Sequence, residues 1–117
     1  MTKFIGIDIG GTGTRLVVTN ERHQVLQEFK ILTSSFSAHS NAESISLLNQ
    51  WVVSNVLDLE TIEAVGIGST GPVNLISGEI NNPDTLPQFS GVDLAGELSK
   101  LINRDVWIDN DANAAGL

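Results

Sequence analysis

Short apolar runs alternate with polar turns over the first thirty residues of the chain. Runs rich in Ile, Val, Leu and Phe cover residues 3–8, 15–20 and 25–31, and this pattern predicts three β-strands. The connections between them are short: residues 9–14 are rich in Gly and Thr, and Thr19-Asn20-Glu21-Arg22 supplies polar turn residues. Because short connections join antiparallel neighbours, the pattern predicts an antiparallel meander.

The apolar spacing becomes helical after residue 41. Apolar residues recur at three- and four-residue steps from Ile45 to Val56, which predicts a helix over about 42–57 with Asn41 as its N-cap. The preceding stretch 33–41 is rich in Ser and has no period, so it is predicted to be a loop.

The second half of the chain alternates strands with helices. Strands are predicted at 64–68 and 106–109, a small hairpin at 73–80, an irregular segment at 81–91 and a helix from about Asp93. The whole order predicts an α/β fold in which a sheet of mixed direction is covered by helices.

The composition and charge of the chain argue against several classes of partner and site. The chain has 41% apolar residues, a net charge of −8 from 14 acidic and 6 basic residues, and no cysteine. The acidic balance disfavours nucleic acid as a partner, and the absence of cysteine excludes disulfides and thiolate metal sites from these residues. No apolar run approaches the about 20 residues of a membrane span, and Met-Thr-Lys followed at once by a strand is unlike a signal peptide, so a cytoplasmic protein is expected.

A glycine-rich segment follows the first strand and carries candidate phosphate-binding chemistry. Gly10, Gly11, Thr12 and Thr14 come directly after Asp8, and bare glycine backbone lets N–H groups approach an anion. The Asp8 carboxylate and the threonine hydroxyls are suited to holding Mg²⁺ against nucleotide phosphates. Because a strand follows and no Gly-Lys-Ser/Thr ends the segment, it is neither a Walker A loop nor a dinucleotide fingerprint. A plain tight turn remains the alternative.

A second acidic segment follows the last predicted strand. The run 109–111 reads Asp-Asn-Asp, and it suits either an N-cap of a following helix or a fixed general base. With a reference pKa of about 3.9, Asp111 would orient a hydroxyl and accept its proton late in transfer.

Two further segments are expected near these motifs. The turn 69–72 also follows a strand and should lie on the same rim, where open α/β sheets bind ligands; a proline-set turn without ligand is the alternative. Asn82, in the irregular segment, offers an amide to a polyhydroxylated ligand, with plain loop as the alternative.

Taken in this order, segments 8–15, 65–74 and 110–115 resemble the phosphate, sugar-side and catalytic motifs of the ROK sugar kinases and their repressor relatives. The resemblance covers nearly the whole chain and implies an RNase H-like, actin-like ATPase lobe. It also implies ATP and Mg²⁺ as cofactors and a hexose or N-acylhexosamine as substrate. Residue by residue, it implies a base at Asp111, sugar contacts at Asn110 and Gly71, phosphate contacts at Gly10, Gly11 and Thr12, and a metal contact at Asp8.

Members of that family are more than twice as long, and their second lobe carries the other ATP motifs and a structural zinc site. The expectation is that residues 1–117 are an amino-terminal lobe without its carboxy-terminal partner and that this lobe is inactive alone. For the full-length protein, a homodimer is one expected assembly. The alternative is the sugar-sensing domain of a ROK-type transcriptional regulator, although Asp8 lies too near the start for a preceding helix-turn-helix. A third hypothesis is an actin-like or Hsp70-like ATPase, which the sugar-side turn at 69–72 does not support.

Overall fold

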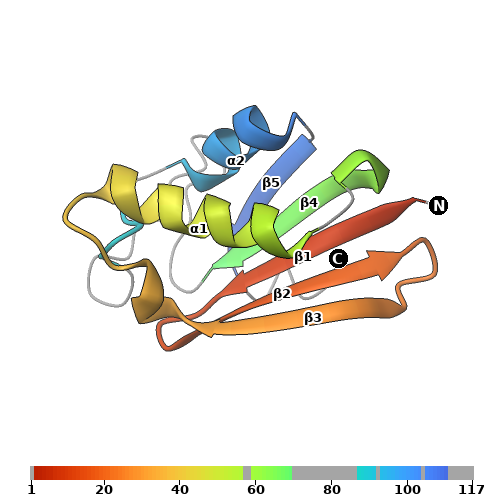
Figure 1. Cartoon of the computed structure of the whole chain (residues 1–117), viewed down its shortest axis with the longest axis horizontal. Helices are drawn as coiled ribbons and strands as arrows, with labels where there is room; N and C mark the ends of the chain where they lie inside the picture. The colour runs from red at the N-terminus through yellow and green to blue at the C-terminus, as the bar shows by residue number, and fades with distance from the viewer. Residues whose placement is uncertain (1, 57–58, 70–86, 92, 104, 111–117) are drawn as a thin grey trace.

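A computed structural model describes residues 2–56, 59–69, 87–91, 93–103 and 105–110, with only the backbone described at 59 and 107–110. Its centre is one five-stranded mixed sheet with the strand order β3-β2-β1-β4-β5 (Figure 1). The strands are β1 (Lys3–Ile9), β2 (Gly13–Asn20), β3 (Val25–Leu32), β4 (Ile62–Ser69) and β5 (Asp105–Asn110).

The predicted meander is confirmed. β1 pairs antiparallel with β2, and β2 pairs antiparallel with β3, because the connections are too short for a crossover. β4 and β5 then add in parallel on the other side of β1. Strand alternation places Ile5, Ile7 and Leu16 in the core, each at most 2% exposed.

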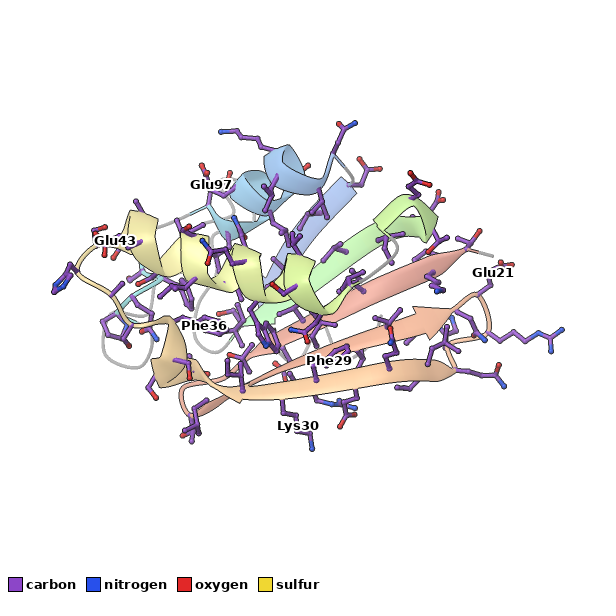
Figure 2. The ribbon with its side chains drawn as sticks, in the orientation of Figure 1. Glu21, Phe29, Lys30, Phe36, Glu43 and Glu97 are labelled. Carbon is purple, nitrogen blue, oxygen red and sulfur yellow. The ribbon has the colours of Figure 1, made fainter. Side chains whose placement is uncertain are left out.

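Two helices cover one face of the sheet, as Figure 1 shows. Helix α1 (Asn41–Asn55) and helix α2 (Leu94–Ile102) both contribute buried apolar side chains to a single core with the strands. Phe36 fills the space between α1 and the sheet (Figure 2), where its ring meets Trp51 edge-on at 5.7 Å. No helix among the described residues is long and apolar enough to cross a membrane.

Two local predictions were wrong. The stretch after β3 is not all loop, because Thr33–Phe36 form the 3₁₀ helix η1. The N-cap of α1 is Ser40 rather than Asn41: the Ser40 hydroxyl accepts a hydrogen bond from the Glu43 N–H at 3.2 Å. The Asn41 amide instead donates to the Ser90 carbonyl oxygen at 2.9 Å, a contact that no local pattern reveals.

The helix predicted over 42–57 ends at Asn55, whereas Asp93 is the N-cap of α2 as predicted, accepting from the Gly96 N–H at 2.9 Å. The predicted hairpin at 73–80 and any helix after Asn110 lie outside the described residues.

Candidate functional site

Three strands that run in the same direction end in one row. In the parallel ladders Ile9 pairs with Ser69, and Ser69 pairs with Asn110. Neighbouring strands are about 4.8 Å apart, so the backbones of Ile9 and Asn110 are separated by about 10 Å. We call this the carboxyl end of the sheet. The glycine turn (residues 10–13) and the segment that starts at Asn110 therefore begin at the same end of the sheet, with Ser69, the last residue of β4, between them.

The glycine turn is held by hydrogen bonds to its carbonyl oxygens. The Gly10 N–H donates to the Gly13 carbonyl at 3.0 Å, and the Thr33 N–H donates to the Thr12 carbonyl at 2.9 Å. The Thr33 hydroxyl donates to the Gly10 carbonyl at 2.7 Å. Gly11 and Thr12 are exposed, and within the described part of the chain their N–H groups have no acceptor. These two amides are therefore available to an anion.

Thr14, expected among the phosphate contacts, has its side chain turned inward. It is 1% exposed, and its hydroxyl lies 2.8 Å from the hydroxyl of Thr33, which is fully buried. The Thr14 hydroxyl thus supports the turn from inside. Sequence reasoning missed Thr33 because it belongs to a serine-rich stretch without periodicity; its place one residue after β3, opposite the glycine turn in the meander, was the available signal.

Asp8 lies exposed near the end of β1, paired across the ladder with Arg15. Arg15 is directed to the next strand, where its Nε donates to Oε2 of Glu28 at 2.9 Å, and Lys30 Nζ lies 3.4 Å from Oε1 of the same carboxylate. The hydrogen bond from Arg15 is the main cause that lowers the pKa of Glu28. Among the described residues, Asp8 makes no hydrogen bond or ion pair.

The described residues at the carboxyl end of the sheet offer few metal ligands. The described residues contain no group of three or more His, Cys, Asp or Glu side chains placed to hold a metal ion. A single free carboxylate such as Asp8 nevertheless fits Mg²⁺, which is commonly held by one or two carboxylates together with substrate phosphates.

The sugar-side candidates Gly71, Asn82 and Asp111 lie outside the described residues, and Asn110 is placed by its backbone alone. The nearby segment 87–90 is described. Phe89 is fully buried, with its ring 6.1 Å from that of Phe36, and Gln88 Nε2 donates to the Thr33 carbonyl at 3.3 Å. η1 therefore contacts both the glycine turn and segment 87–90.

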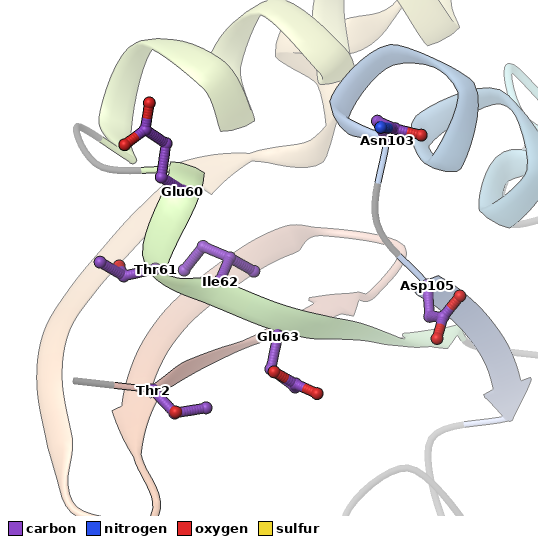
Figure 3. Close-up of a pocket in the computed structure, with 7 residues that line it drawn as sticks. All are labelled: Thr2, Glu60, Thr61, Ile62, Glu63, Asn103 and Asp105. Carbon is purple, nitrogen blue, oxygen red and sulfur yellow. The ribbon is translucent and has the colours of Figure 1, made fainter.

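A polar pocket of about 610 Å³ lies at the opposite end of the sheet (Figure 3). We call this the amino end, because β4 and β5 begin there. Three of its lining side chains are carboxylates, and these disfavour an anionic ligand. The lining residues are Thr2, Glu60, Thr61, Ile62, Glu63, Asn103 and Asp105.

Comparison with known proteins identifies the family of the chain. The sequence profile of the ROK family matches residues 4–117. The chain is 30% identical over 112 residues to the glucokinase of Thermotoga maritima, covering 96% of this chain and 34% of that protein. It is 32% identical over 114 residues to an N-acetylmannosamine kinase of Vibrio cholerae, covering 97% and 37%. The chain thus spans about a third of the length of these relatives.

Solved structures give the same result. A ROK family glucokinase from Streptomyces griseus, in complex with glucose and AMPPNP, superposes with a TM-score of 0.72 at 27% identity, covering 97% of this chain and 35% of that one. A ROK family transcriptional regulator shares the fold, with a TM-score of 0.73 at 17% identity. The mixed sheet is therefore the actin-like ATPase fold of these proteins, and the chain belongs to the ROK family.

Proposed function

We propose that residues 1–117 form the amino-terminal domain of an ATP-dependent sugar kinase. Its reaction would transfer the γ-phosphoryl group of ATP to a hydroxyl of a hexose or N-acylhexosamine. The observation that carries the proposal is that Ile9, Ser69 and Asn110 lie in one row across the sheet. The proposed phosphate and catalytic motifs therefore both begin at one end of the sheet. Relatives that are glucokinases and N-acetylhexosamine kinases support the substrate class.

On the ATP side, the glycine turn is the proposed phosphate site. The amides of Gly11 and Thr12 would donate to phosphate oxygens, with Gly10 allowing close approach. Asp8 would hold Mg²⁺, which neutralises charge on the phosphates when it is bound. Thr14 would act indirectly, since its buried hydroxyl meets Thr33 instead of the exposed side of the turn.

On the sugar side, Asp111 is proposed as the general base and Asn110 as a hydrogen-bond partner of the sugar. Gly71 and Asn82 are proposed to line the sugar pocket. Because phosphoryl transfer depends mainly on positioning and charge stabilisation, the base needs a rigid place near the phosphate site. The supporting observation is that Asn110, the residue before Asp111, is the last residue of β5.

We further propose that a carboxy-terminal lobe completes the ATP site and carries the structural Zn²⁺ of the family. The complete protein could then assemble as a homodimer. ATP is an intracellular metabolite, which supports a cytoplasmic location. The 117-residue chain alone is expected to show no kinase activity.

The test is an ADP-release assay of the complete gene product with ATP, Mg²⁺ and, in turn, glucose, N-acetylglucosamine and N-acetylmannosamine. Sugar-dependent ADP release is expected with at least one of them. Equal ADP release with and without sugar would instead indicate an Hsp70-like or actin-like ATPase. Sugar binding by calorimetry without ADP release would indicate the sugar-sensing domain of a ROK regulator.

A further inference from the structure

We infer that Thr33 is a positioning residue for the phosphate-binding turn, an inference that rests on the proposed kinase function. Thr33 is the first residue of η1 and is fully buried. It touches the glycine turn through both its backbone and its side chain, although it lies about twenty residues further along the chain. Its proposed role is to fix which way the peptide groups of the turn face.

The hydrogen bonds of Thr33 make this role specific. Its N–H donates to the Thr12 carbonyl at 2.9 Å, and its hydroxyl donates to the Gly10 carbonyl at 2.7 Å. A hydroxyl has one proton, so the 2.8 Å contact between the two threonine hydroxyls is a donation from Thr14 to Thr33. The carbonyl of Thr33 in turn accepts from Gln88 Nε2 at 3.3 Å. Every polar group of this buried residue is therefore used.

Because a peptide group is planar, the contacts of Thr33 also fix the direction of the Gly11 N–H, which is proposed to bind an anion. The carbonyl of Gly10 and the N–H of Gly11 belong to one trans peptide, so they point in opposite directions; the described backbone contains no cis peptide. Because Thr33 holds the Gly10 carbonyl toward the interior, the Gly11 N–H is directed outward. A reversed peptide would present a carbonyl dipole to the phosphate and repel it.

The glycines of the turn need a hydrogen bond from outside to fix their orientation. Gly10 and Gly11 have no Cβ to restrict their dihedral angles, so their peptide groups can rotate at little cost. A contact from outside the turn must select one orientation. Thr33 supplies it, which separates its role from that of a residue that only fills space.

The test compares Thr33→Val with Thr33→Ser in the complete gene product. Valine keeps the shape and removes the hydroxyl, whereas serine keeps the hydroxyl. For Thr33→Val we expect the KM for MgATP to rise about 10-fold, the range for a buried hydrogen bond left unmade, while the sugar dissociation constant, measured without ATP, changes less than about 2-fold. Thr33→Ser should restore the KM to within about 3-fold of the parent, because the hydrogen bond to Gly10 is retained.

Ser44→Ala is the matched control. Ser44 is also a fully buried hydroxyl, but it lies in α1, and its oxygen has no hydrogen-bond partner in the part of the chain that the structure describes. Removing it should leave the KM for MgATP unchanged. Thr14→Val provides a second test should Thr33→Val fail to fold: it removes the donor to Thr33 but keeps the bond to Gly10, so a rise of about 2- to 3-fold is expected.

A local readout does not depend on turnover. Hydrogen exchange of the Gly10 amide, which donates to Gly13 within the turn, should be faster in Thr33→Val and unchanged in Ser44→Ala. An active parent enzyme whose KM for MgATP is the same in Thr33→Val would overturn the inference and leave the kinase function intact. A parent protein with no sugar-dependent ADP release would overturn the proposed function and the inference with it.

Discussion

The two ends of the sheet differ in the backbone groups they expose as well as in the segments they carry. The glycine turn and the first turns of α1 and α2 lie at the carboxyl end, as Figure 1 shows. Gly11 and Thr12 in that turn are exposed. At the amino end, α2 finishes at its C-cap Asn103, beside the carboxylates of Glu63 and Asp105 (Figure 3). Helix N-termini carry partial positive charge and C-termini partial negative charge. The carboxyl end also carries carboxylates, at Asp8 and around the helix starts, so the exposed amides of the glycine turn are what favour the proposed phosphate site there.

This difference follows from the direction of the strands. Each helix after a strand returns across the sheet to begin the next parallel strand. The N-termini of α1 and α2 consequently fall at the carboxyl end, where β1, β4 and β5 finish. The acidic lining of the amino-end pocket argues against an ATP site there. Changes at the two ends should therefore have unequal effects.

The largest effect is expected for Asp111→Asn, at the proposed general base that follows Asn110 in the sequence. Loss of a general base lowers kcat by about 10²- to 10⁴-fold, and the sugar should still bind. Steady-state kinetics of the complete gene product, with calorimetry for sugar binding, check this. Asp105→Asn, at the amino end, is the control and should change kcat less than about 2-fold. Similar losses in both variants would remove the distinction between the two ends.

The next effect is expected for Asp8→Asn. If Asp8 holds Mg²⁺, the half-saturating Mg²⁺ concentration should rise at least about 10-fold, because interactions with a charged group contribute about 1.5–3 kcal/mol. Glu63→Gln, an exposed strand carboxylate at the amino end, is the matched control. Mg²⁺ titrations of ADP release separate the two variants, and an unchanged Mg²⁺ requirement in Asp8→Asn would remove Asp8 from the metal site.

Smaller effects are expected at the helix starts that give the carboxyl end its polarity. Ser40→Ala and Asp93→Ala each remove an N-cap and should lower the free energy of unfolding by about 1 kcal/mol. Urea denaturation followed by circular dichroism measures this. Ser37→Ala is a suitable comparison, since within the described residues its hydroxyl makes no hydrogen bond. Equal stability of all three variants would show that the caps contribute nothing.

The smallest effect is expected on the exposed ion pair of Arg15 and Glu28, which joins β2 to β3. The pKa of Glu28 lies below its ordinary value of 4.5 because of Arg15. Since a depressed carboxyl pKa stabilises the fold above the ordinary pKa, that stabilisation is lost as the pH falls through the lowered pKa. Arg15→Gln should move the Glu28 pKa back toward 4.5 in an NMR titration, and high salt should do the same in the parent. If the Glu28 pKa moves neither in Arg15→Gln nor at high salt, the ion pair does not form in solution.

Several features could be predicted from the sequence because they depend on neighbours along the chain. The meander followed from alternating apolar residues and short turns, and the α2 cap from an acidic residue just before a helical period. The α1 cap was missed because Ser40 and Asn41 are both good capping residues. The choice between them was made by Ser90, which takes the Asn41 amide from 49 residues away.

The sequence by itself determined the five strands, the helices α1 and α2 and the acidic character of the chain, since each depends on residue type and local spacing. Only the tertiary structure decided that Ile9, Ser69 and Asn110 share one row, that Thr14 faces inward, and that Thr33 holds the glycine turn. These are contacts between segments far apart in the chain. Their geometry is set by strand register and by the packing of η1, which no local pattern encodes.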